Sequence, residues 1–335
     1  MLFSKCKDKI KIAKAFISAK AFKKYSPIFV SLSLTNRCNL RCAYCKVTQR
    51  DTGELNTSEV FSIVRSLAQM GTRMISLTGG EPLMRDDIGN IISYIKQFGM
   101  TVRMLTNGIM LPQRISEVRT LDELRISLEG DEEEHERLRG AGTFKKTIYA
   151  MELARSEGIN VTLSTGLTAQ NVLISKFLIE LAHRLNLNIH MHPLHSLDYF
   201  CFDELEKLLP NNEQYRKGIR KVLYYKKMYP SLIRNSIASL KYYLSWPHPQ
   251  GNIQCAAGRI LCRISSKGIM YPCVLMEQRY DGMNCLEKGV ERAFEALSKN
   301  REFLSLCSGC WCSGTLELNC LYSMKLAVWL NLLNL

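Results

Sequence analysis

The sequence predicts an α/β protein whose parallel sheet is built from successive strand–helix units. Six short segments rich in β-branched and apolar residues recur along the chain, and stretches with helical spacing of apolar residues separate most of them. Strands that alternate with helices form parallel sheets covered by helices on both faces. The predicted strands are residues 28–35, 73–80, 101–108, 123–130, 160–166 and 188–194.

Two intervening segments show the helical pattern most clearly. Residues 58–70 carry apolar side chains at Val60, Val64 and Leu67, and residues 176–185 repeat this spacing. Such spacing places the apolar side chains on one face of a helix, which can then pack against the sheet.

Composition limits the class of protein. The chain has 335 residues, of which 46% are hydrophobic and 23% charged, enough for one large α/β domain with or without a small second one. No signal-peptide pattern and no run of about eighteen apolar residues is visible, so we expect a cytoplasmic location. In that compartment the 13 cysteines are better explained as metal ligands than as disulfides.

The net charge of +14 raises the question of a nucleic-acid partner. Eight lysines precede Tyr25 and supply much of the excess, and such a basic tail is most often a solvated face. No nucleic-acid-binding module is recognisable, so a nucleic-acid partner is not expected. We assign residues 1–27 to a basic N-terminal helical extension.

Polar residues follow each predicted strand, at the end where parallel α/β proteins place their active sites. They include Thr106, Ser127, His190 and His192. The alternative is that individual residues only cap the following helices. The two histidines share a face of the last strand and could bind substrate or move protons, or be satisfied polar groups, and the sequence leaves both interpretations open.

Three cysteines, Cys38, Cys42 and Cys45, follow the first predicted strand. A structural zinc ion needs four protein ligands, so three thiolates leave it one short. A [4Fe–4S] cluster is also held by cysteine thiolates, and with three of them one iron keeps an open position for a substrate or cofactor.

These motifs resemble those of the radical S-adenosylmethionine (SAM) superfamily. The resemblance rests on Cys38-x3-Cys42-x2-Cys45, with Tyr44 before the last cysteine, and on "TGGEP" at residues 78–82. It implies a partial (β/α)6 TIM-like barrel over residues 28–200. It also implies a catalytic [4Fe–4S] cluster held by three cysteines plus SAM. In this reaction type SAM is reductively cleaved, and the resulting 5′-deoxyadenosyl radical takes a hydrogen atom from the substrate.

The resemblance also implies cofactor contacts. Glu81 would accept a hydrogen bond from the amino group of SAM, the backbone at Gly79 and Gly80 would approach the cofactor, and the backbone around Tyr44 would meet its adenine. Within residues 127–144, which resemble a run found in the branch with an auxiliary cluster, Arg139 would pair with the SAM carboxylate or be an ordinary helix-face arginine. The implied cofactor-binding residues are Tyr44, Gly79, Gly80, Glu81, Pro82, Thr106, Ser127 and Arg139.

The second half of the chain is predicted to form a helical connector at residues 201–250 and a cysteine-rich domain at residues 251–322. Cys255-x12-Gly268-x4-Cys273 resembles the opening of the SPASM and twitch extensions of the superfamily. The expected ligands of one auxiliary [4Fe–4S] cluster are Cys255, Cys273, Cys307 and Cys310, with Cys262, Cys312 and Cys320 as further candidates. Zinc is the alternative for four cysteines. Leu316 stands where the full SPASM pattern has a cysteine, so a second auxiliary cluster is not expected.

Both termini suggest helices. Ile10, Ala13 and Ile17 would form one apolar stripe flanked by lysines, and residues 323–335 would form an apolar helix. Such helices suit peripheral contact with an anionic membrane and a lipid-like substrate, or they pack on the barrel.

Together these features predict an enzyme that acts on a peptide or a small metabolite, with an electron donor such as flavodoxin or ferredoxin. A lipid-like substrate and RNA modification are the alternatives within the superfamily. A non-catalytic iron–sulfur redox sensor is the alternative outside it, but the intact "GGEP" argues against a sensor, which needs no SAM-binding segment.

Overall fold

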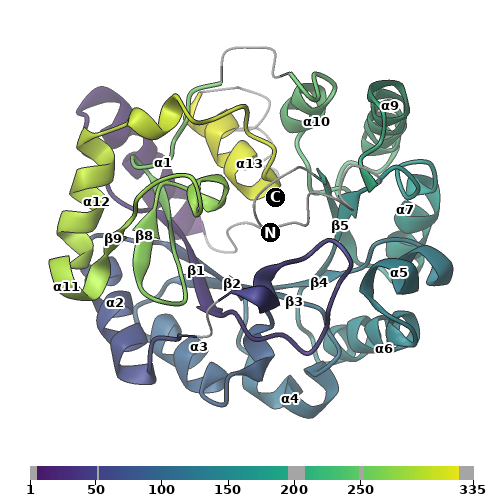
Figure 1. Cartoon of the computed structure of the whole chain (residues 1–335), viewed down its shortest axis with the longest axis horizontal. Coiled ribbons are helices and arrows are strands. Elements are labelled where there is room, and N and C mark those ends of the chain that lie inside the picture. The colour runs from purple at the N-terminus through teal and green to yellow at the C-terminus, as the bar shows by residue number, and fades with distance from the viewer. Residues whose placement is uncertain (1–5, 51–52, 195–207, 249–252, 324–335) are drawn as a thin grey trace.

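We describe a computed structural model of the chain over residues 6–50, 53–194, 208–248 and 253–323. In these ranges nine strands form a single sheet in the order β6-β5-β4-β3-β2-β1-β7-β8-β9. The sheet curves into an open barrel whose edge strands, β6 and β9, do not pair (Figure 1). The strands are β1 Phe29–Thr35, β2 Met74–Gly79, β3 Thr101–Thr106, β4 Glu123–Ser127, β5 Val161–Leu167, β6 Asn188–Pro193, β7 Leu261–Ile264, β8 Ile269–Tyr271 and β9 Met283–Asn284.

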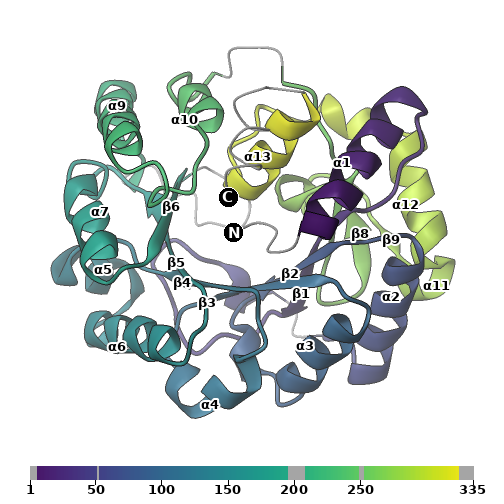
Figure 2. The ribbon, with the colours of Figure 1, turned by 180° about the vertical axis from the view of Figure 1, so that it is seen from behind.

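The first six strands are parallel to their neighbours, and each coincides with a predicted strand. The partial barrel is thereby confirmed. The described helices are α1 Cys6–Ala21, α2 Thr57–Gln69, α3 Ile88–Gln97, α4 Leu111–Val118, α5 Glu132–Arg139, α6 Thr143–Ser156, α7 Ser175–Arg184, α9 Asn212–Met228, α10 Ile237–Tyr243, α11 Cys285–Lys288, α12 Val290–Lys299 and α13 Ser313–Tyr322. Helices α2 to α7 surround the convex side of the sheet, and α13 lies on its open side (Figures 1 and 2).

Helix α2 illustrates how local sequence defines an element. The Asn56 side chain accepts a hydrogen bond from the Glu59 backbone N–H at 3.0 Å, and the Glu59 carboxylate accepts one from the Asn56 N–H at 2.8 Å. This capping box satisfies backbone donors that the first helical turn leaves free. The helix then buries Val60, Val64 and Leu67 against the sheet, as their spacing predicts.

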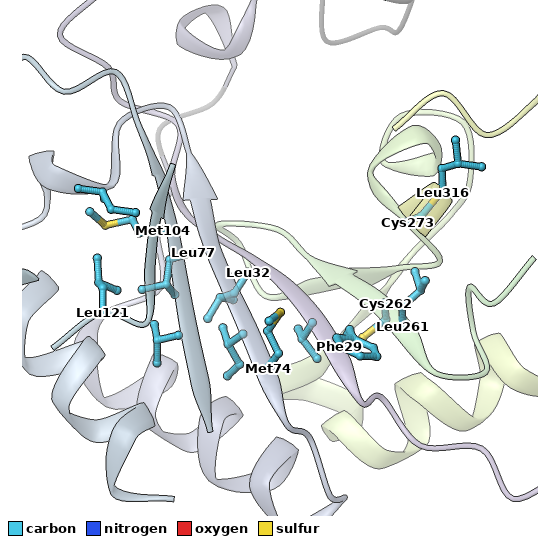
Figure 3. Close-up of a cluster of buried hydrophobic side chains, with 14 of the residues drawn as sticks. Phe29, Leu32, Met74, Leu77, Met104, Leu121, Leu261, Cys262, Cys273 and Leu316 are labelled. Carbon is cyan, nitrogen blue, oxygen red and sulfur yellow. The ribbon is translucent and has the colours of Figure 1, made fainter. Parts of the chain in front are cut away.

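The cysteine-rich C-terminal segment extends the barrel sheet. Strand β7 pairs in parallel with β1, with Phe29 opposite Leu261, and β8 returns antiparallel to β7 through a turn at Gly268. Figure 3 shows Phe29, Leu261 and Cys262 within one apolar core that continues across β1 to β3. The described part of residues 251–322, which were predicted as a separate domain, therefore shares a sheet and a core with the barrel.

The apolar stripe predicted for α1 is not the face of the helix that packs on the barrel. Ile10 and Ile17 are 51% and 53% exposed, and a different face of the helix is buried. That buried face consists of Ile12, Phe16 and Ala19. Phe16 packs edge-on against Phe29 of β1, with ring centroids 6.2 Å apart. The helix carries two sets of apolar residues at helical spacing, and only its position against β1 decides which set is buried.

The face of α1 that packs on the barrel is thus distinct from the predicted stripe, and contact of that stripe with a membrane stays a prediction. Figure 2 shows α1 in the foreground, whereas the loop after β1 lies in the foreground of Figure 1. No described helix has the length and apolar character needed to cross a membrane. The apolar C-terminal helix predicted at residues 323–335 lies, beyond its first residue, outside the described residues.

Candidate active site

The cysteine loop, residues 36–46, follows β1 at the carboxyl ends of the parallel strands (Figure 1). Cys38, Cys42 and Cys45 all lie on it and are partly exposed. The Cys38 sulfur accepts hydrogen bonds from the Leu40 N–H at 3.5 Å and from the Asn107 side-chain amide at 3.8 Å. The loop thus presents three accessible thiols and tethers one of them to the end of β3.

The thiols of the cysteine loop influence one another. Burial, together with the Glu81 carboxylate and the thiols of Cys42 and Cys45, raises the pKa of Cys38 to about 11. Free thiols with such pKa values keep their protons at neutral pH. Because iron is bound by thiolates, cluster binding must release these protons.

Gly79 and Gly80 bring the loop after β2 against the cysteine loop. Gly79 has a φ of +142°, and a Cβ on Gly80 would lie 2.1 Å from the Arg37 carbonyl oxygen. The close approach allows the Gly80 N–H to donate to the carbonyl oxygen of Thr35 at 2.7 Å. It also allows the Glu81 N–H to donate to the carbonyl oxygen of Arg37 at 2.8 Å. In the structure, therefore, these glycines lock two loops of the chain together.

We expect Gly80→Ala to lower the free energy of unfolding by roughly 2–4 kcal/mol, because the new methyl group must push the two loops apart. Gly314→Ala is the matched control, since a Cβ at that position in α13 meets no atom within 4 Å. Urea unfolding followed by circular dichroism compares the two variants. Equal midpoints would show that the loops separate at no cost.

The Glu81 carboxylate is completely buried and is held by the chain itself. It accepts hydrogen bonds from the Leu83 N–H at 3.1 Å, the Thr106 hydroxyl at 2.8 Å and the Asn107 N–H at 2.7 Å. A carboxylate offers about four acceptor positions, so one remains for the predicted bond to an amino group. Pro82 begins the short 3₁₀ helix Pro82–Met84 that follows.

Arg139 pairs with Glu129. Two nitrogens of the Arg139 guanidinium donate to the same Glu129 oxygen at 2.6 and 3.1 Å, and the Tyr44 hydroxyl donates to it at 2.8 Å. The guanidinium also lies 5.8 Å from the centre of the Tyr44 ring. This arginine thereby joins the cysteine loop to the end of β4, and its contact with the cofactor carboxylate stays a prediction.

The second Glu129 oxygen accepts the Gly166 N–H at 2.9 Å, which extends the contact to β5. Burial alone would raise the pKa of Glu129, but the Arg139 guanidinium and the hydrogen bonds from Tyr44 and Gly166 outweigh it and lower the pKa. Glu129 is therefore ionised at neutral pH and fixes the position of Tyr44 between two cysteines.

The remaining predicted polar residues lie along the inner face of the sheet. Ser127 of β4 lies opposite Ser164 of the neighbouring strand β5, and Ser164 lies opposite His190 of β6. The rings of His190 and His192 are 6.5 Å apart between centroids. Burial lowers the pKa of both histidines, so both are neutral at pH 7. His195 lies outside the described residues.

Five cysteines of the second half gather into one group. Burial raises the pKa of Cys310, and nearby thiols raise it further. Those thiols belong to Cys312, Cys255, Cys273 and Cys307. Cys262 is instead buried in the core near Cys285, and Cys320 is buried within α13. Within the described ranges, no three His, Cys, Asp or Glu side chains are placed to hold a single metal ion.

A pocket of about 350 Å³ opens beside this group of thiols. Cys307, Trp246, Trp311 and Leu209 contribute to its wall. Leu209 also packs against the small apolar cluster that contacts Cys42 and Cys45. Because Leu209 belongs to both, the pocket lies close to both groups of cysteines.

The sequence assigned no specific role to Asn107, one of the polar residues at the strand ends, and it did not indicate Asn171. Asn107 contacts Cys38 and Glu81, and Asn171 donates to the main chain of Glu129 and Gly166, both at 2.7 Å. The "TNG" at the end of the third predicted strand was a usable signal for Asn107. Asn171 lies in a loop, and nothing in the local sequence marks its role.

Comparison with known proteins agrees with this geometry. The model of the radical SAM superfamily matches residues 32–172. The Fe-coproporphyrin III synthase of Methanosarcina barkeri is 32% identical over 45% of this chain. The mycofactocin maturase MftC of Mycolicibacterium smegmatis is 27% identical over 74% of it. The matches span 40% and 64% of the length of these two relatives.

Solved structures show the same fold. SuiB of Streptococcus suis bound to S-adenosylmethionine superposes with a TM-score of 0.68 at 17% identity, covering 92% of this chain and 79% of SuiB. SuiB bound to its precursor peptide SuiA gives a TM-score of 0.65 at 16% identity, covering 90% and 72%.

The donor set of the cysteine loop fits a [4Fe–4S] cluster, since three partly exposed thiols lie on one short loop. The matched region contains these thiols, the Gly79–Gly80 contact and the buried Glu81. Residues 32–172 thus match the radical SAM domain.

Proposed function

We propose that this chain is a radical SAM enzyme that abstracts a hydrogen atom from a peptide, with a small metabolite as the alternative substrate. The observation that carries the proposal is the locked pair of loops at the carboxyl ends of β1 and β2. The three thiols stand on one loop, and the buried Glu81 on the other connects it to β3. This places thiols and polar acceptors around one position at the barrel mouth.

Cys38, Cys42 and Cys45 would hold the cluster, and SAM would take its open position. When bound and reduced, the cluster would supply the electron that cleaves SAM, and this cleavage would provide a carbon radical for hydrogen abstraction. The chain's own groups support this site. The Asn107 amide donates to the Cys38 sulfur, which favours the thiolate, and apolar residues around Tyr44 shield Cys42 and Cys45 from water.

A peptide substrate is supported by the relatives and by the pocket. SuiB is known with a bound precursor peptide, and the mycofactocin maturase aligns over most of this chain. The pocket beside Cys307 has the size of a ligand site, and Trp246 and Trp311 give it the aromatic surface that binds side chains well. An electron donor such as flavodoxin or ferredoxin would supply the reducing equivalent.

The test is an anaerobic assay of the reconstituted protein with SAM and dithionite. The proposal predicts that 5′-deoxyadenosine forms, as measured by liquid chromatography. Its absence in a preparation that binds about four or more irons per chain would contradict the proposal.

We further propose one auxiliary [4Fe–4S] cluster held by Cys255, Cys273, Cys307 and Cys310, with Cys312 as an alternative ligand because it lies in the same group of thiols. The Arg301 guanidinium, which donates to the Cys255 carbonyl at 3.1 Å, places a positive charge beside this group. A positive charge favours the thiolate form that binds iron.

The expected result is that a variant with Cys38, Cys42 and Cys45 replaced by alanine still binds about four irons per chain, with a cubane absorption spectrum. Alanine replacement of the four auxiliary ligands in that variant should remove the remaining iron. Stoichiometric zinc in place of iron would instead identify the C-terminal site as structural.

A further inference from the structure

A group of buried charges lies on the inner face of the barrel, apart from both sets of cysteines. Arg103 of β3 and Arg125 of β4 both pair with Glu123, at 2.6 and 2.9 Å. The Thr162 hydroxyl of β5 donates to the same carboxylate at 2.9 Å. We call Arg103, Glu123, Arg125 and His190 the inner arginine cluster; each is at most 8% exposed.

The inner arginine cluster contains one more positive charge than negative charge. Burial and Arg125 lower the pKa of Arg103 to about 10, which leaves it charged at neutral pH. Two guanidinium groups therefore share a single carboxylate. In the part of the chain that the structure describes, Nη2 of Arg103 and Nδ1 of His190 are buried and have no hydrogen-bond partner. Buried charges without a full set of partners are unfavourable, so this arrangement calls for an anion.

The inner arginine cluster lies next to the predicted cofactor site. Ser127 stands two residues beyond Arg125 on β4, and alternate residues of a strand share a face about 7 Å apart. Ser127 is also level with His190 through Ser164 of β5. A group bound at Arg125 would therefore lie next to Ser127, the residue that the family resemblance assigns to SAM binding, on the side toward the start of β4.

We propose that the inner arginine cluster binds a carboxylate of the substrate, so that the enzyme prefers acidic substrates. This inference rests on the proposed function. A guanidinium binds a carboxylate through paired, charge-assisted hydrogen bonds. The free Nη2 of Arg103 would donate to this carboxylate, which would balance the excess positive charge.

Thermal unfolding of the anaerobically reconstituted full-length protein tests the proposal. The probes are N-acetyl-glutamate amide, which carries one carboxylate, and its neutral isostere N-acetyl-glutamine amide. We expect only the charged probe to raise the melting temperature. Arg125→Met should weaken binding of the charged probe roughly tenfold or more, because a charge-assisted hydrogen bond is lost.

Two further variants keep the test decisive if Arg125→Met folds poorly. Glu123→Gln leaves both guanidinium groups without a carboxylate and should bind the charged probe more tightly than the wild type. Arg119→Met removes an exposed arginine that pairs with Glu157 and should respond as the wild type does. Equal responses to the two probes, or none, would overturn the proposal.

The same carboxylate chemistry exists in SAM, so the melting temperature is also measured with SAM. If Arg125→Met loses its response to SAM but keeps that to the charged probe, the inner arginine cluster serves the cofactor and the proposal is wrong. Failure of the proposed function is separate. A protein that binds the charged probe but forms no 5′-deoxyadenosine would contradict the radical SAM activity while supporting carboxylate binding.

Discussion

Replacement of Cys38, Cys42 and Cys45 by alanine is expected to reduce 5′-deoxyadenosine formation to the uncatalysed background. The three thiols are the only protein groups that the cysteine loop offers to a cluster, and without thiolates the iron cannot be held there. The assay is SAM cleavage with dithionite under anaerobic conditions, with the wild type as reference. We expect the whole activity to be lost, because the variant leaves no thiolate on the cysteine loop.

The matched control is Cys285→Ala, which removes a buried thiol that lies near Cys262, outside both groups of cysteines. It should retain wild-type activity after correction for the amount of folded protein. Undiminished 5′-deoxyadenosine formation by the triple-alanine variant would exclude the cysteine loop as the catalytic centre. In that event the C-terminal thiols would be the remaining candidates.

Glu129→Ala is expected to lower the free energy of unfolding by roughly 3–5 kcal/mol, because it leaves a buried guanidinium without its partner. Arg139 is 10% exposed and Glu129 is 5% exposed, so solvent cannot replace the lost carboxylate. The variant also removes the acceptor of the Tyr44 hydroxyl and of the Gly166 N–H. Urea unfolding at pH 7 measures the change.

The pair of Arg119 and Glu157 serves as the control. Its N–O distance of 2.7 Å is close to the 2.6 Å between Arg139 and Glu129, but its side chains are 54% and 29% exposed. Glu157→Ala should therefore cost less than about 1 kcal/mol. If the two variants lose the same stability, burial does not strengthen the Arg139–Glu129 pair.

The pH dependence of stability follows from the lowered pKa of Glu129. A carboxylate whose pKa is lower in the folded state binds protons more readily in the unfolded chain. Its contribution is fully present above the unfolded value of about 4.3 and is lost as the pH falls through the folded value. The difference in stability between the wild type and Glu129→Ala should thus shrink below about pH 4.

The local sequence was sufficient to predict those elements whose hydrophobic pattern allows only one packing partner. The six parallel strands and helix α2 were predictable because strand and helix periodicities depend only on nearby residues, and a helix that follows a strand has one sheet to pack on. The cysteine loop and "TGGEP" were visible for the same reason, since each motif is contiguous.

Other features depend on residues far apart in the sequence. The pairing of β7 with β1, the buried face of α1 and the contact of Arg139 with Glu129 each required knowledge of which element lies opposite. The charges of Arg103 and Arg125 are easily seen in the sequence, but the single carboxylate that they share is not. Periodicity states which side chains share a face, whereas only the packed chain determines what that face meets and whether its charges are balanced.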